Sequence, residues 1–164
     1  MSHLEFIKKQ AKQLYKDWKS HTEIEGTNGF VAYHYNPKFF NIDNLFFYYE
    51  LSPDDEKKFS LMKAQHMVAQ MVGYTKWTEL IQATDKELEL AAILLKHFKD
   101  VGCIKAWEYA FDYRGMEEMD INSQIKYAKS FFNSEDFIFF ADLSCSGGYD
   151  SDMDNLYMSE YDWW

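Results

Sequence analysis

The chain has 164 residues, of which 47% are apolar and 19% aromatic, so it can bury enough surface for a packed core. Its 7 glycines and 2 prolines are too few for a turn-rich all-β fold or for a low-complexity disordered chain. The formal net charge is −10, and residues 101–164 hold 4 basic and 13 acidic residues, which excludes them as a surface for nucleic-acid phosphates.

The first predicted element is a helix within residues 1–20. Ser2 can cap it, and Glu5 completes a capping box. Apolar residues recur at spacings of three and four, which places them on one face, and lysines occupy the other positions. We interpret the lysines as a solvent-exposed basic face, with an anionic ligand or an acidic segment of the same chain as the alternative. The apolar face consists of Leu4, Ile7, Ala11, Leu14 and Trp18, and the basic face of Lys8, Lys9, Lys12, Lys16 and Lys19.

The region from residue 20 to residue 51 has a different character. Residues 26–29, Gly-Thr-Asn-Gly, are typical of a turn. Residues 30–35 are rich in aromatic and β-branched side chains, with partial alternation, which predicts a short strand or hairpin. The aromatic residues that follow, over residues 39–49, predict a packed but irregular connection.

Residues 52–100 carry several helix signals. The serine–proline pair at residue 52 favours a helix start. A longer helix begins at Leu61 and ends at Gly73, because glycine readily adopts the backbone conformation that follows a helix. We expect Thr75 to cap a second, short helix.

A third helix follows directly. Thr84 and Glu87 form a second capping box at its start, and we expect the helix to end at Gly102. Three helices with such short links cannot each bury an apolar face alone. They therefore predict a compact bundle over residues 60–100, against which the first helix packs.

The last third of the chain carries fewer signals. Residues 107–113 fit either a helix or a strand, and Asp120 can cap a helix. The short apolar run Phe137–Phe140 predicts a strand.

These elements together predict a single domain over residues 1–164. The fold class is mainly α, a small helical bundle with a minor β element, and α+β is the alternative. The helical core covers about residues 1–20 and 52–100. An acidic and aromatic C-terminal part covers residues 101–164.

The central segment carries the pattern Ala-Gln-x-x-x-Ala-x-x-x-Gly-Tyr-x-x-Trp-x-x-Leu from Ala64 to Leu80. This pattern resembles a helical module of uncharacterised bacterial proteins, some of them named as members of the glyoxalase superfamily. In those proteins a helix similar to Lys9–Leu14 precedes the run, so the resemblance extends over residues 5–95 of this chain. The pattern contains no metal ligand and marks a structural module, so it implies no lyase chemistry and no defined function.

Neither a catalytic nor a phosphate-binding motif stands out, and we expect no cofactor. Paired carboxylates could serve acid–base chemistry, although such runs are usually solvated faces or helix caps. The acidic residues in question are Glu117, Glu118, Asp120, Glu135 and Asp136.

The aspartates Asp150, Asp152 and Asp154 have the opening pattern of a calcium loop. The match then fails, because Asn155 replaces the glycine of the sharp turn and Tyr161 replaces the bidentate glutamate. The three aspartates are therefore a candidate calcium site, and the alternative interpretation is a solvated acidic tail.

Residues 130–164 combine eight acidic and ten aromatic residues with no basic residue. They either fold back onto the core or bind a partner, with Tyr157, Tyr161, Trp163 and Trp164 as partner-binding candidates. The leading hypothesis is a non-enzymatic protein-interaction or regulatory module of a bacterium. The alternatives are an acidic nucleic-acid mimic that binds a DNA-binding protein, and a small enzyme with a site assembled from scattered residues.

The two cysteines, Cys103 and Cys145, lack the spacing of a metal site or a C-x-x-C motif, which favours a reduced, cytoplasmic setting. The first residues lack the apolar core of a signal peptide, and no apolar run is long enough for a membrane span. We therefore expect a cytoplasmic protein. Its partner is another protein or a second copy of itself, rather than nucleic acid or a membrane.

Overall fold

The computed structural model describes residues 1–145, with side chains over residues 1–143. This part of the chain is mainly α-helical with one two-stranded antiparallel sheet, which confirms the predicted fold class. Within it, no helix combines the length and the apolar character needed to cross a lipid bilayer. The elements are α1 (His3–Lys19), β1 (Thr22–Glu25), β2 (Val31–His34), α2 (Ile42–Tyr48), α3 (Pro53–Lys57), α4 (Leu61–Met71), α5 (Trp77–Ile81), α6 (Asp85–His97), α7 (Val101–Tyr113), the short 3-10 helix η1 (Met116–Glu118), α8 (Ile121–Phe131) and α9 (Glu135–Cys145).

Hydrogen bonds at the helix starts confirm the caps predicted at Ser2, Thr84 and Asp120. At α1 the Glu5 backbone N–H donates to Ser2 Oγ (3.1 Å), and the Ser2 N–H donates to the Glu5 carboxylate (2.7 Å). Thr84 and Glu87 form the same reciprocal pair at α6, with distances of 3.3 and 2.8 Å. The Asp120 carboxylate accepts from a backbone N–H in the first turn of α8 (3.1 Å). Each cap satisfies backbone donors that a first turn leaves without a partner inside the helix.

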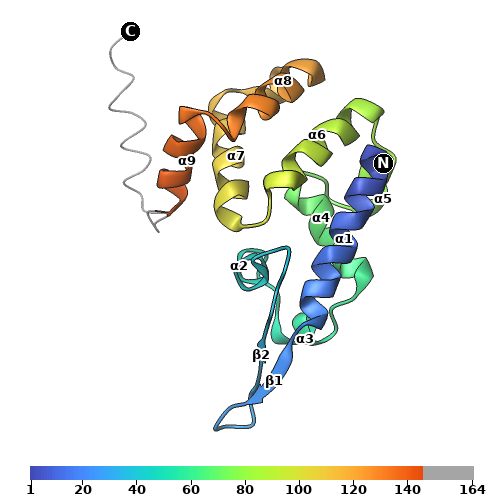
Figure 1. Cartoon of the computed structure of the whole chain (residues 1–164), viewed down its shortest axis with the longest axis vertical. Coiled ribbons are helices and arrows are strands. Elements are labelled where there is room, and N and C mark those ends of the chain that lie inside the picture. Colours follow the sequence, from blue (N-terminus) through green and yellow to red (C-terminus); the bar gives the residue numbers. More distant parts are fainter. Residues whose placement is uncertain (146–164) are drawn as a thin grey trace.

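Helix α1 lies against α4 and α6, as predicted for the first helix and the bundle (Figure 1). Its predicted apolar face is the buried one, since Ile7, Ala11 and Leu14 are fully buried. Leu4 and Trp18 are half-buried and pack against the same core. The lysines of α1 are all exposed.

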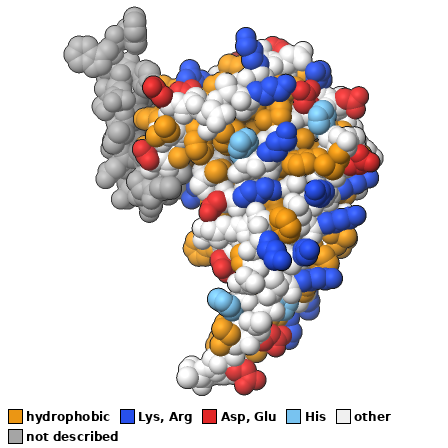
Figure 2. Space-filling model, viewed as in Figure 1, with side chains coloured by type: hydrophobic (Ala, Val, Ile, Leu, Met, Phe, Trp, Pro, Cys, Tyr) orange, Lys and Arg blue, Asp and Glu red, His pale blue; other side chains and the backbone are white. Residues whose placement is uncertain are grey.

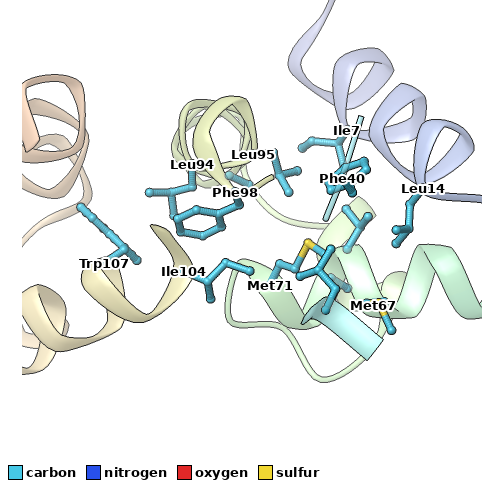
Figure 3. Packing of buried hydrophobic residues seen from close by; sticks show 14 of the residues in the cluster. Ile7, Leu14, Phe40, Met67, Met71, Leu94, Leu95, Phe98, Ile104 and Trp107 are labelled. Atoms are coloured by element: carbon cyan, nitrogen blue, oxygen red, sulfur yellow. The ribbon is translucent and has the colours of Figure 1, made fainter. Parts of the chain in front are cut away.

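One apolar core extends from α1 through the bundle into the C-terminal helices (Figure 3). It continues from Ile7 and Leu14 on α1, through Phe98 at the end of α6, to Ile104 and Trp107 on α7. Helix α8 contacts α6, and α9 contacts α7. The described portion of the C-terminal part is therefore packed on the helical core.

Strands β1 and β2 form an exposed hairpin that projects from the helices (Figure 1). Their antiparallel register pairs Thr22 with His34, so the strand predicted within residues 30–35 is confirmed. Gly29 lies in the connecting turn with φ +73°, a backbone conformation that glycine adopts without steric cost.

Two segments form helices where the sequence predicts other structure. The irregular connection predicted over residues 39–49 is wrong, because these residues contain α2. The strand predicted at Phe137–Phe140 is also wrong, because the run belongs to α9. A four-residue apolar run fits both structures, and here the helix packs along α7 and brings Phe137 against Phe131, with ring centroids 5.7 Å apart. Residues 107–113, which fit either structure, belong to α7.

Two predicted helix boundaries are wrong. Gly102 does not end α6 but lies in the first turn of α7, because the Asp100 carboxylate accepts from its N–H (3.4 Å) and caps a new helix. Thr75 does not cap α5, which begins at Trp77. The Trp77 N–H donates instead to His66 Nδ1 (3.3 Å), so a side chain of α4 takes the place of a local cap.

Candidate functional site

Two adjoining hollows lie where the end of α4 meets α6, α7 and α8. Their volumes are about 560 and 260 Å³, and both are lined by Val72, Gly73, Trp107 and Phe111. We call the two hollows together the acidic cleft. Its other lining residues are Met71, Tyr74, Glu87, Leu90, Ala91, Leu94, Glu108, Asp112, Glu117, Met119, Ile121 and Gln124.

The floor of the acidic cleft is aromatic and apolar. Trp107 is 5% exposed, and its ring centroid lies 6.2 Å from that of Phe111 and 5.4 Å from that of Phe131. Leu94 of α6 lines the same hollow and is buried (Figure 3). Because these side chains belong to the close-packed core, the floor is rigid.

One wall of the cleft is the end of α4. Gly73 has φ +90°, as predicted for the residue that ends this helix. The Tyr74 N–H then donates back to the Ala69 carbonyl (2.9 Å), and the Gly73 N–H donates to the Gln70 carbonyl (3.1 Å). This turn brings the Tyr74 side chain to the cleft, where burial and the charge of Glu87 raise the pKa of its hydroxyl.

Four carboxylates surround the floor. Glu87 and Glu117 line the larger hollow, and Glu108 and Asp112 line the smaller one. Burial raises the pKa of Glu108 and the charge of Asp112 adds to the effect, while a hydrogen bond from the Tyr48 hydroxyl (2.8 Å) opposes it. Within the described part of the chain, neither hollow is lined by a lysine or an arginine.

The helix ends add to this negative charge. Helices α4 and α7 both end at the cleft, and neither has a basic residue in its last turn. The carbonyl end of a helix carries a partial negative charge, so both ends favour a cation. Arg114 follows α7, but its guanidinium pairs with Asp136 (2.7 Å).

A side-chain amide holds the remaining wall in place. Gln124 Nε2 of α8 donates to the carbonyls of Met116 (2.8 Å) and Met119 (3.0 Å), which lie at the two ends of η1. Met116 is fully buried, so η1 is attached both by packing and by hydrogen bonds. Glu117 is thereby positioned at the rim of the cleft.

This arrangement suits a cation that also has apolar surface. An aliphatic stem can lie on the apolar floor while its charged end reaches the carboxylates, and aromatic faces attract cations. The described residues contain no group of three or more His, Cys, Asp or Glu side chains that could hold a metal ion.

The structure separates the acidic residues that the sequence singles out. Glu117 lines the acidic cleft, Asp120 caps α8, and Asp136 pairs with Arg114 and accepts from the Tyr127 hydroxyl (3.0 Å). Of these three residues from the paired-carboxylate hypothesis, only Glu117 lines the acidic cleft. The calcium candidates Asp150, Asp152 and Asp154 and the partner-binding candidates Tyr157, Tyr161, Trp163 and Trp164 lie outside the described residues.

Sequence reasoning missed most of the cleft because its residues come from several separate elements. Glu108 and Asp112 did leave a signal, since they stand four residues apart and thus share one side of a helix. That signal becomes readable only once residues 107–113 are known to be helical. The acid excess of residues 101–164 points to the same end of the molecule.

Comparison with known proteins finds no matching family model, no matching curated protein and no matching solved structure. The resemblance of Ala64–Leu80 to a bacterial helical module stays a prediction. The structure gives the residues of its pattern packing roles, since Ala64, Ala69 and Leu80 are fully buried and Gly73 ends α4.

Proposed function

We propose that this protein is a non-enzymatic, cytoplasmic interaction module that binds a basic segment of another protein in the acidic cleft. One observation carries the proposal. Four carboxylates, an aromatic floor and two helix ends meet in a cleft whose described lining contains no basic residue.

The chemistry of the cleft favours arginine or lysine side chains. A guanidinium group stacks on aromatic rings and binds carboxylates in a bidentate manner. Phe111 supplies a half-buried ring, and Trp107 lines both hollows with the small part of its ring that is exposed. Asp112 and Glu117 supply exposed carboxylates at the rim. Charge pairs formed partly out of water are stronger than pairs on an open surface.

The charge of the whole chain supports the same partner. At a net charge of −10, the protein attracts a basic segment before contact. Such steering acts mainly on the association rate and weakens as ionic strength rises. A complex formed in this way should therefore be sensitive to salt.

A fluorescein-labelled octa-arginine peptide tests the proposal by fluorescence anisotropy. The D112K/E117K variant reverses two exposed charges at the rim and should weaken binding by about tenfold. The control variant E23K/E25K makes the same change of net charge on the exposed strand β1. It should change the affinity by no more than about twofold, which is the effect of overall charge alone.

Equal losses in the two variants would mean that the peptide responds only to net charge, and the proposal would be wrong. Far-UV circular dichroism shows whether each variant keeps its helices. Both pairs of residues are exposed, so both variants should fold.

A further inference from the structure

The exposed side of α1 carries five solvent-exposed lysines, and Figure 2 shows Lys and Arg side chains gathered over this helix. We call this surface the lysine face. It extends for about 16 Å along the helix axis, since each residue of a helix rises about 1.5 Å. It consists of Lys8, Lys9, Lys12, Lys16 and Lys19.

The lysines of this face repel one another. Lys8, Lys12 and Lys16 follow at intervals of four residues, so their ammonium groups lie on the same side of the helix. Like charges at this spacing destabilise a helix. Because the opposite side of α1 is buried against α4 and α6, the lysine side stays exposed to solvent. A bound anion would relieve this repulsion.

The two acidic residues of α1 neutralise the lysine face only in part, since the charge of Glu5 acts on Lys8 but both carboxylates also accept hydrogen bonds elsewhere. Glu5 accepts from the Ser2 N–H in the capping box (2.7 Å). Asp17 is buried and accepts from three backbone N–H groups over residues 38–40. The cations that form ion pairs in the described part of the chain are Lys63, Lys86, Arg114 and Lys129, all outside α1.

The spacing of the lysine face fits an extended acidic segment. Four residues of helix rise about 6 Å. Alternate residues of an extended chain place their side chains on the same side about 6.6 Å apart. Asp150, Asp152 and Asp154 alternate in this way in the sequence of this chain, and residues 146–164 contain five acidic and no basic residues.

We propose that the lysine face binds the segment Asp150–Asp154 of a second copy of the chain, in a reciprocal exchange that produces a two-fold symmetric dimer. Figure 1 places α1 and α9, which precedes this segment, on opposite sides of the molecule. This arrangement favours a second copy over the same copy. The proposal does not depend on the acidic cleft.

Larger polyanions fit the surroundings of the lysine face less well. A nucleic acid or an anionic membrane extends far beyond the five lysines of the face, whereas a short acidic segment matches the length of the face. A short acidic segment interacts only with charges within a Debye length, about 8 Å at physiological salt. The apolar side of α1 is buried and cannot enter a lipid layer.

Sedimentation velocity of the full chain tests the proposal. The wild type should form dimers at low ionic strength and dissociate as salt is added. The variants K12E/K16E and D150N/D152N/D154N should each raise the dimer dissociation constant by about tenfold. The control K57E/K126E, with the same charge change at exposed positions of α3 and α8, should shift it by no more than about twofold.

A charge exchange adds a stricter test. Combining K8D/K12D/K16D with D150K/D152K/D154K in one chain should restore the dimer, because the paired charges are swapped. A wild type that stays monomeric, a control variant that dissociates as much as K12E/K16E, or an exchange variant that stays monomeric would each overturn the proposal. Single-stranded DNA bound by the wild type but not by K12E/K16E, with dimerisation unchanged, would also overturn it and assign the face to nucleic acid.

Discussion

Replacing Asp17 with alanine should lower the free energy of unfolding by about 4 kcal/mol, because one buried and two partly buried N–H groups lose their acceptor. A buried donor left without a partner costs roughly 1–3 kcal/mol. Asp17 is 2% exposed. Its Oδ1 accepts from the Lys38 N–H (2.8 Å), and its Oδ2 accepts from those of Phe39 (2.9 Å) and Phe40 (2.8 Å). One carboxylate at the end of α1 thus holds the chain that returns from the hairpin.

The loss of Asp17 also affects Lys99 of the neighbouring α6 end. Burial lowers the pKa of Lys99 to about 8, and the negative charge of Asp17 opposes that shift. Its ammonium group lies 4.2 Å from the centroid of the Phe40 ring and donates to Gln10 Oε1. Without Asp17 this half-buried cation has no compensating carboxylate in the same cluster, which adds to the destabilisation.

Urea unfolding followed by far-UV circular dichroism measures the effect of Asp17. The D17N variant is the matched control, since it keeps one acceptor oxygen and the same size, and it should lose about half as much stability as D17A. A loss below about 1 kcal/mol in D17A would show that the three N–H groups find other partners, and the role given to Asp17 would be wrong.

Replacing Trp107 with alanine should lower the free energy of unfolding by about 4 kcal/mol, the usual cost of deleting a large buried aromatic side chain. The ring lies within 6.5 Å of four other aromatic ring centroids: Phe111 at 6.2 Å, Tyr127 at 6.0 Å, Phe131 at 5.4 Å and Phe132 at 6.4 Å. It joins α7 to α8, so its loss should loosen the C-terminal helices before the α1–α4–α6 core.

The W107F variant separates packing from binding. It keeps an aromatic ring in the core and should lose about 1–2 kcal/mol of stability, so it folds. The smaller ring offers less surface to a cation, and the affinity for octa-arginine should fall by about threefold. Unchanged stability in W107A would contradict the packing described for α7 and α8.

The starts of α1, α6 and α8 were predictable from sequence because their signals are local. Ser2 with Glu5, and Thr84 with Glu87, lie within one turn of each other and satisfy each other's hydrogen bonds. The end of α4 at Gly73 is of the same kind, since it depends on one residue that tolerates a positive φ.

The features that the sequence did not predict depend on partners far away along the chain. From sequence, Asp17 is expected to be an ordinary polar residue of a surface helix. Its carboxylate oxygens instead accept hydrogen bonds from the backbone of residues 38–40, more than twenty residues later. His66 replaces a cap at α5, and Asp100 starts α7 before Gly102 can end α6. The acidic cleft also depends on residues far apart along the chain, because the end of α4 and helices α6 and α7 all contribute to its lining.

An NMR titration of the full chain with octa-arginine shows whether the acidic cleft binds a basic segment. Amide and indole N–H signals report which residues the peptide approaches. If the peptide binds in the cleft, the largest shifts are those of the Trp107 indole and of the backbone amides of Gly73, Tyr74 and Phe111, which line it. Shifts spread evenly over the acidic surface, with the Trp107 indole unchanged, would contradict binding in the cleft.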